Sequence, residues 1–182
     1  MEDYAYILDY LPTGRQDVHK FRREPVAYAV GESEFKLFEL TPKEGVTLTI
    51  SEKVYIGKDM ERREKILHVK RRVGYNDLTH NAQKELRYVI EDIVKNNEKR
   101  FVEFYNTAPP ITTRLHSLAL LPGLGKKTMW QILEEREKKP FESFDDIKER
   151  VPSLKHPEKP IVERILTELM DPNQKYRLFV AK

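Results

Sequence analysis

The feature that most constrains this chain is a change in hydrophobic period at Gly74. Before Gly74, short runs rich in β-branched and aromatic residues are separated by turn residues, which is the pattern of strands joined by tight turns. After it, apolar residues recur at three- and four-residue spacing, as on one face of a helix. Because the strands all precede the helices, we expect an α+β fold. The β-prone runs are residues 4–10, 26–30, 35–40, 46–50, 53–56 and 66–73.

Five or six short strands with closely spaced turns predict a small barrel or sandwich. An OB-type barrel is the natural candidate for a segment of this length. An SH3-like barrel stays open as the alternative, because hydrophobic periodicity does not separate the two. The β-prone residues from Tyr176 to Val180 are a candidate for one more strand that returns to the barrel.

The helical part begins with an apolar stripe on residues 82–94, for which Thr79 or Asp77 is the candidate N-cap. Asn96-Asn97 is a candidate interruption, beyond which the apolar face continues to Asn106. This segment is therefore expected to hold one helix or two that connect the barrel to the rest of the chain.

A boundary falls at Ala108-Pro109-Pro110, because proline stops a helix and restricts the residue before it. Beyond it, the apolar pattern predicts four helices. Thr112 or Thr113 would cap the first, Ser143 the third, and Pro157 would occupy the first turn of the fourth. The predicted organisation is an OB-like barrel over 1–74, connecting helices over 75–108, a helical domain over 109–170 and a tail over 171–182.

The composition narrows the class of protein without identifying it. The chain is 39% hydrophobic and 35% charged, with a net charge of +3 and a pI of about 8.9. A balance this mild requires any phosphate-binding charge to be concentrated locally. The absence of cysteine excludes disulfides, thiolate metal sites and cysteine nucleophiles. With no apolar run near ~20 residues and no signal-peptide layout, we expect a cytoplasmic protein that has no membrane partner.

The motif that carries chemistry reads L-P-G-L-G-K-K over residues 121–127. Gly123 and Gly125 bracket one apolar residue, so the backbone is expected to turn tightly with positive φ. Leu124 would anchor the turn between two helices. The amides of residues 123–126 would then point outward at the positive end of the second helix, which is a favourable place for an anion.

Lys126 and Lys127 fall in the first turn of that second helix. Cations there oppose the helix dipole, so helix stability does not explain them, whereas a bound phosphate would. A structural helix–turn–helix corner is the alternative reading, since Pro-Gly turns join helices in many proteins. The coincidence of two spaced glycines with a lysine pair favours phosphate binding.

These residues resemble the helix-hairpin-helix motif of DNA repair and recombination proteins. The stretch from Leu115 to Leu169 is similar to a tandem pair of such motifs, with Val151-Pro152-Ser153-Leu154 in the place of the second hairpin. That second hairpin lacks both glycines, so phosphate contact is assigned to the first alone. The resemblance also implies a monovalent cation at the carbonyls of residues 121–126, with no other cofactor.

The chain as a whole resembles an uncharacterised archaeal family of predicted OB-fold nucleic-acid-binding proteins. The segments Y-A-Y-I-L-D-Y-L-P-T-G-R at 4–15 and I-T-T-R-L-H-S-L-A-L-L at 111–121 carry this likeness. It implies nucleic-acid binding, with RNA favoured over DNA, and no established reaction.

Basic residues also cluster in the last β-prone run and in the first long loop. Strand alternation over residues 66–73 would place Lys70 and Arg72 on one face, which predicts a basic face on the barrel. Arg22 and Arg23 follow an aromatic residue, a combination that suits a single strand whose bases stack on rings. An ordinary solvated surface explains both clusters about equally well.

Three tyrosines of the first β-prone run, Tyr4, Tyr6 and Tyr10, have even spacing and are expected on one strand face. Core packing explains them at least as well as base stacking does.

No pattern of catalytic residues is found in the sequence. The five histidines show no metal-ligand spacing, and there is no Walker-type loop. The Gly-Leu-Gly at 123–125 joins helix to helix, whereas a dinucleotide fingerprint joins strand to helix. We therefore expect a protein that is not an enzyme and that has no catalytic or metal residues.

The sequence thus predicts a non-enzymatic nucleic-acid-binding protein. The hairpin would hold the phosphate backbone, and the basic barrel face would follow a strand. The alternative is an adaptor whose helical domain docks a transcription or translation factor, a protein partner in information processing. Trp130 discriminates between a structural role, if it is buried, and a partner surface, if it is exposed.

Overall fold

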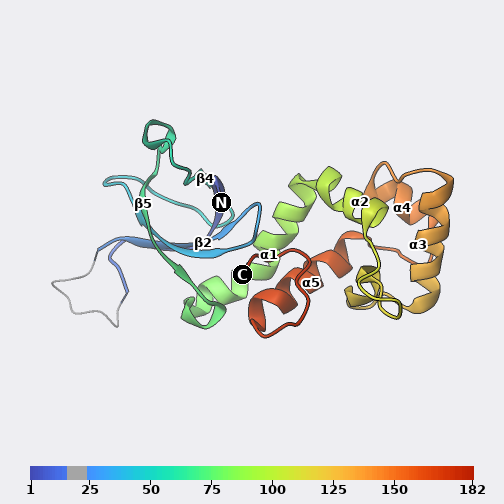
Figure 1. Ribbon diagram of the computed structural model, residues 1–182. Helices are drawn as coiled ribbons and strands as arrows, with labels where there is room; N and C mark the ends of the chain where they lie inside the picture. The colour runs from blue at the N-terminus through green and yellow to red at the C-terminus, as the bar shows by residue number, and fades with distance from the viewer. Residues whose placement is uncertain (16–23) are drawn as a thin grey trace. The chain divides into compact units, whose positions relative to one another are not determined.

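The computed structural model describes residues 1–15 and 24–182 (Figure 1). The described chain falls into two compact units, one within residues 1–90 and 168–182 and the other within residues 91–167. The first unit holds the sheet, and the second holds most of the helices. The predicted α+β class is therefore confirmed.

The sheet of the first unit has five antiparallel strands in the order β4-β1-β2-β3-β5. Figure 1 shows that it curls, as a sheet of short twisted strands does. Each strand coincides with a β-prone run of the sequence. The bounds are β1 Tyr4–Leu11, β2 Val26–Gly31, β3 Leu37–Pro42, β4 Lys53–Tyr55 and β5 Ile66–Val73.

Both faces of the central strands are buried, which explains why β2 reads as an unbroken apolar run. One face carries a core of small and large apolar side chains that includes Ala29 and Phe38. The opposite face carries Tyr28 and Val30, which are also fully buried. A strand with both faces covered gives no polar–apolar alternation in its sequence, so its length and flanking turns identify it.

Three register shifts interrupt the strand alternation of the described sheet, one between β1 and β2 and two between β3 and β5. In β1, Ile7 pairs with Ala29 and Asp9 with Tyr28, so that Leu8 is an extra residue. Bulges of this kind add local bend and twist to a sheet. The β1 bulge overturns one prediction: Tyr10 packs against the core face whereas Tyr6 lies on the opposite face, so the three tyrosines of β1 do not share a face.

The strand predicted over residues 46–50 is not formed. β4 pairs with residues 4–6 of β1, and the segment before β4 packs by its side chains. Leu48 is buried in the core, and the carbonyl of Val46 accepts a hydrogen bond from the Tyr10 hydroxyl at 3.0 Å.

Helix α1, His80–Asn96, begins where the sequence places its cap. The Thr79 hydroxyl accepts from the Ala82 amide at 3.0 Å and donates to the Asp9 carboxylate at 2.6 Å, which ties the helix start to β1. Asp77, the other candidate cap, lies in the short 3₁₀ helix η3, Tyr75–Asp77, and its carboxylate accepts from Gly74.

The chain after residue 170 contains no strand, contrary to the one predicted over residues 176–180. Its amides are taken by a side chain: the buried carboxylate of Glu168 accepts from Leu178, Phe179 and Val180 at 2.8–3.1 Å. Arg72 of β5 holds the next two residues, donating to the carbonyls of Ala181 and Lys182. The carboxylate thus satisfies backbone donors that a sheet ladder would otherwise satisfy.

The second unit is helical. The predicted interruption at Asn96-Asn97 is confirmed, because α2, Glu98–Thr107, starts directly after Asn97. The helices that follow are α3 Lys126–Lys138, α4 Phe144–Arg150 and α5 Glu158–Met170, whose last residues belong to the first unit. Ser143 caps α4 as predicted, accepting from the Asp146 amide at 2.9 Å. No helix of the described residues is long and apolar enough to cross a membrane.

Candidate functional site

The turn between residues 121 and 126 combines a buried start with an exposed tip. Leu121 is buried, Leu124 is half-buried, and both glycines are exposed. Gly123 has φ +79°, a conformation that favours glycine, whereas Gly125 has φ −73°, which any residue adopts. The prediction of positive φ is therefore confirmed for Gly123 and wrong for Gly125. Gly125 serves instead as the N-cap of α3.

The amides of the turn are largely open. Leu124 donates to the carbonyl of Leu121 at 3.2 Å, so the expectation of an outward amide is wrong at Leu124. Within the described chain, the amides of Gly123, Gly125, Lys126 and Lys127 have no hydrogen-bond partner. A Cβ built on either glycine would meet no atom of the described chain within 4 Å, so the space directly beside each glycine is open there.

Charge reinforces this open helix start. Lys126 and Lys127 are exposed in the first turn of α3, which holds no acidic residue. Neither lysine has an ion-pair partner among the described residues, unlike Lys138 at the other end of the helix, which pairs with Glu135 at 2.7 Å. Free backbone donors, the positive end of a helix dipole and two uncompensated cations therefore coincide at one surface.

The element before the turn differs from the predicted helix. It is a single 3₁₀ turn, η4, Ser117–Leu120, capped by His116 and not by Thr112 or Thr113. The Nδ1 atom of His116 accepts from the Leu118 amide at 3.1 Å, which requires a deprotonated nitrogen. Burial lowers the pKa of His116, and the charge of Arg136 lowers the pKa further. The Thr112 hydroxyl instead accepts from Arg114 and Leu115 in an earlier turn.

The segment Val151-Pro152-Ser153-Leu154 forms a similar turn between α4 and α5. Leu154 donates to the carbonyl of Val151 at 2.9 Å, the same bond that Leu124 makes to Leu121. The second turn contacts the start of α3, because the hydroxyl oxygens of Ser153 and Thr128 lie 2.9 Å apart. The sequence does not reveal this contact.

The C-terminal end of α3 is held by Arg150 of α4. Its guanidinium donates to the backbone carbonyls of Glu135 and Lys139 at 2.5 and 2.7 Å, and to the carboxylate of Glu135 at 3.4 Å. Arginine satisfies carbonyls that the last helical turn leaves free. The exposed lysines at the start of α3 therefore lie on a helix whose C-terminal end is fixed by Arg150.

The two basic side chains predicted to share one face of β5, Lys70 and Arg72, are engaged in separate contacts. A bulge at Lys70 breaks the alternation, since Val69 pairs with Leu40 and Arg71 with Glu39. Lys70 contacts the buried Glu39 carboxylate at 3.9 Å together with Arg71 at 2.6 Å. Arg72 is committed to the carbonyls of the C-terminal segment. Lys70 and Arg72 therefore do not form one free basic face.

The other predicted contacts have mixed outcomes. Arg22 and Arg23 lie outside the described residues. Trp130, on α3, is 63% exposed. Among the described residues, no group of three or more His, Asp or Glu side chains is arranged to hold a metal ion.

The chain is similar to two archaeal proteins over nearly its whole length. The family described as "Protein of unknown function (DUF655)" matches residues 1–181. The uncharacterized protein MJ0038 of Methanocaldococcus jannaschii is 50% identical over 180 residues, covering 98% of this chain and 80% of that protein. The crystal structure of Af1531 from Archaeoglobus fulgidus, described with the same family, matches with a TM-score of 0.91 and 50% identity, covering 99% of this chain and all of that one.

Proposed function

This chain belongs to the DUF655 family, and we propose that it is a non-enzymatic nucleic-acid-binding protein that holds a phosphate backbone at the turn over residues 121–127. The observation that carries the proposal is the set of amides at Gly123, Gly125, Lys126 and Lys127, which have no hydrogen-bond partner among the described residues, with open space beside the two glycines. Backbone amides at a helix start bind anions without reading bases, so the contact would be independent of sequence.

The proposal includes a tandem helix-hairpin-helix module in the second unit. Its support is the pair of turns with similar backbone bonding, at 121–124 and 151–154, and the contact of Ser153 in the second turn with Thr128 in the first turn of α3. The second turn lacks a glycine and is followed by Lys155, His156 and Pro157 before α5 begins. We therefore assign phosphate contact to the first turn alone, with a monovalent cation at its carbonyls as part of the proposal.

The proposal assigns an OB-like barrel to the first unit. Its support is a curled five-stranded antiparallel sheet in which β1 pairs with both β2 and β4. OB-type barrels bind single strands, which favours RNA or an unpaired segment as the ligand. Arg22 and Arg23, outside the described residues, stay in the proposal as contacts, and no catalytic step is assigned.

The decisive experiment compares two double variants of α3. Lys126→Ala/Lys127→Ala removes two charges from the start of the helix, and Lys138→Ala/Lys139→Ala removes two from its end. We expect the first to weaken RNA binding and to reduce the salt slope by about 2, since each phosphate contact contributes about 1. The second should leave the slope unchanged. Equal effects of both pairs in a salt titration by filter binding would refute the hairpin as the contact.

A matched glycine variant isolates the backbone donors. Gly125→Ala fits its φ of −73°, and the added methyl points into open space, so the fold should tolerate it. A methyl there would obstruct an anion that approaches the amides. Reduced affinity with an unchanged melting temperature supports a backbone contact, and unchanged affinity contradicts it.

A second candidate function is an adaptor that docks a transcription or translation factor through the helical unit. The exposure of Trp130 favours it, because a tryptophan that is 63% exposed on a helix is typical of a partner surface. Trp130→Ala separates the candidates. Lost capture of a protein partner with RNA binding intact would support the adaptor, whereas weaker RNA binding would place the ring in the nucleic-acid contact.

A further inference from the structure

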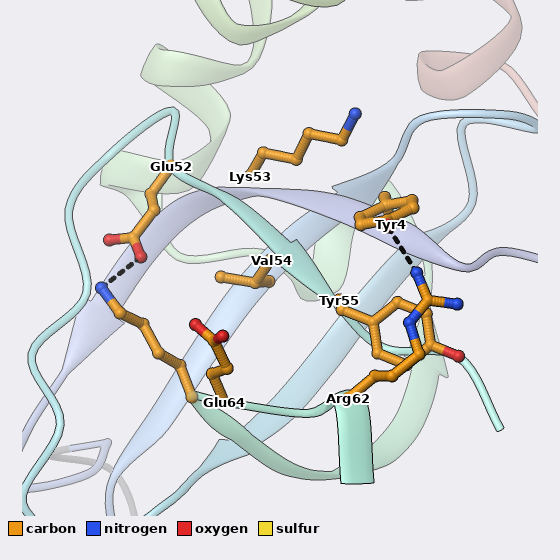
Figure 2. Close-up of a pocket in the computed structure, with 8 residues that line it drawn as sticks. Tyr4, Glu52, Lys53, Val54, Tyr55, Arg62 and Glu64 are labelled. Atoms are coloured by element: carbon orange, nitrogen blue, oxygen red, sulfur yellow. Dashed lines mark hydrogen bonds and ion pairs between the residues drawn. The ribbon is translucent and has the colours of Figure 1, made fainter. Parts of the chain in front are cut away.

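A cavity of about 390 Å³ lies along the outer edge of β4, far in sequence from the hairpin (Figure 2). We call it the β4-edge pocket. Its volume is in the range of sites that hold a small organic group. Tyr4 of β1, residues 52–55 and residues 62, 64 and 65 line it.

Two tyrosine rings form one wall of the β4-edge pocket. Tyr4 and Tyr55 are a cross-strand pair, and their ring centroids lie 5.4 Å apart at 70°. Both side chains are half-buried, so part of each is accessible, and the Lys53 Nζ atom lies over the Tyr4 ring, 4.6 Å from its centroid, where a stacking base would have to displace it. Exposed aromatic surface of this kind is what unpaired bases stack on in single-strand-binding proteins.

Arg62 stands beside both rings, as Figure 2 shows. Its guanidinium lies 4.4 Å from the Tyr55 centroid and donates to the Tyr4 hydroxyl at 2.9 Å. An arginine has five N–H donors, and this contact uses one of them. The contact with the rings orients the guanidinium and leaves its other donors for a ligand.

Charge compensation distinguishes Arg62 from the other cations of the pocket. Lys53 pairs with Glu32 at 3.0 Å, and Lys65 pairs with Glu52 at 2.5 Å. Arg62 has no carboxylate partner within the described chain. An exposed guanidinium without a counter-charge, next to aromatic rings, suits the phosphate of a nucleotide.

Glu64 sets a further condition on the ligand. Its exposed carboxylate lines the same pocket and, among the residues that the structure describes, has no hydrogen-bond or ion-pair partner. An ionised carboxylate only accepts hydrogen bonds, and it accepts two at once from adjacent donors. It would repel a phosphate, so the group placed against it should be a donor edge.

The free edge of β4 adds backbone groups to the pocket. Ile7 donates to Glu52 and Ile56 donates to Asp3, which fixes the hydrogen-bonded pairs between β1 and β4. By the alternation of antiparallel ladders, the N–H and C=O groups of Lys53 and Tyr55 then face away from β1. Since β4 ends the sheet, no strand pairs with that edge.

We propose that the β4-edge pocket binds an unpaired guanine nucleotide. The base would stack on the tyrosine wall, its adjacent N1–H and N2–H₂ groups would donate to Glu64, and its phosphate would bind Arg62. Guanine is chosen because its Watson–Crick edge carries two neighbouring donors, whereas adenine, cytosine and uracil each place an acceptor beside their donor. The proposal rests on the proposed function for its ligand, an RNA strand.

The test measures fluorescence anisotropy of labelled uridine heptamers, either uniform or with one central G, A or C. We expect the wild-type chain to bind the G heptamer roughly 10-fold more tightly than the uniform one, the scale of one well-read base. Glu64→Gln should reduce that preference to about twofold or less. This variant changes an exposed side chain that has no partner in the described part of the chain, so its fold should be intact.

Two further variants test the tyrosine wall and the Arg62 guanidinium. Tyr55→Leu and Arg62→Ala should weaken every heptamer by about fivefold or more, whereas Lys84→Ala, an exposed lysine on α1, should not. Equal wild-type affinity for all four heptamers overturns the pocket, as does a G preference that survives Glu64→Gln. If those results accompany binding that depends on Lys126 and Lys127, the hairpin function stands alone. If no heptamer binds, the proposed function and the pocket fail together.

Discussion

The hydroxyl groups of Thr128 and Ser153 lie 2.9 Å apart and join the first turn of α3 to the turn at 151–154, whose backbone bonding is similar to that of the turn before α3. Ser153 also donates to the side-chain oxygen of Gln131 at 2.7 Å, so both contacts connect the second turn to the first half of α3. The helix start that carries the free amides is therefore held from the neighbouring turn.

This contact predicts an energetic coupling between the two turns. Thr128→Val and Ser153→Ala should each lower the free energy of unfolding by about 1 kcal/mol or less, since the bond is exposed. Because they remove the same hydrogen bond, the double variant should lose less than the sum of the two. Urea denaturation of the four proteins measures this, and strictly additive losses would show that the contact is not formed in solution.

The free energy of unfolding is expected to depend on pH through the titration of His116. Burial, with the Arg136 charge, lowers its pKa in the folded chain, so the unfolded chain binds the proton more readily. Stability from His116 is therefore fully present above the ordinary value of about 6.5 and is lost as the pH falls through the folded pKa. The melting temperature should decrease from pH 7.5 to pH 5.5.

His116→Asn provides the control, because asparagine can cap the 3₁₀ turn and does not titrate. The variant should lose less stability between the two pH values than the wild-type chain does. An identical decrease in both proteins would assign the pH dependence to other groups.

Replacing Gly31 with any larger residue is expected to disrupt packing in the first unit. A Cβ at this position would lie 1.8 Å from the Glu2 carboxylate. That carboxylate is buried and accepts from the amides of Ser33, Glu34 and Lys36, so it cannot move without losing them. Gly31→Ala should cost about 2–3 kcal/mol.

The cause can be assigned with a second substitution. Glu2→Ala removes the clashing side chain, so Gly31→Ala should add little to the loss that Glu2→Ala causes alone. A full additional loss in the double variant, measured by chemical denaturation, would show that the clash with Glu2 is not the cause.

The buried hydroxyl of Tyr105 is expected to stabilise the second unit through its hydrogen bond. It is fully buried, and its hydroxyl donates to the carbonyl of Pro157 at 2.5 Å. Burial raises the pKa of Tyr105, so the hydroxyl keeps its proton and remains a donor at neutral pH. Tyr105→Phe should lower stability by about 1–3 kcal/mol, because the carbonyl loses its partner. Tyr88→Phe, on an exposed ring, should change it by less than about 0.5 kcal/mol.

Local chemistry in the sequence was enough to predict several elements. Thr79 and Ser143 cap helices where short polar side chains precede apolar stripes. Asn97 ends α1 and Gly123 adopts positive φ, as residues with those backbone preferences do. Such features depend on a few neighbouring residues, so these helix starts and this turn could be predicted from the sequence, whereas the strands expected over 46–50 and 176–180 do not form.

Features that depend on distant partners could not be predicted in this way. The bulges at Leu8 and Lys70 follow from pairing with β2 and β3, and they changed which side chains share a face. The Glu168 carboxylate accepts hydrogen bonds from the amides of the last segment, which therefore does not form the expected strand. No local sequence pattern indicates this contact.

The two candidate sites differ in the same way: one depends on neighbouring residues and the other on residues far apart in the sequence. The hairpin at 121–127 was found from the sequence because its glycines and lysines are adjacent and their backbone preferences are local. The β4-edge pocket was not, because Tyr4, Tyr55 and Arg62 are brought together by strand pairing and by the path of the chain between β4 and β5. Sequence alone thus determined which backbone shapes each segment can adopt, and tertiary packing decided which side chains and amides remain free to bind a ligand.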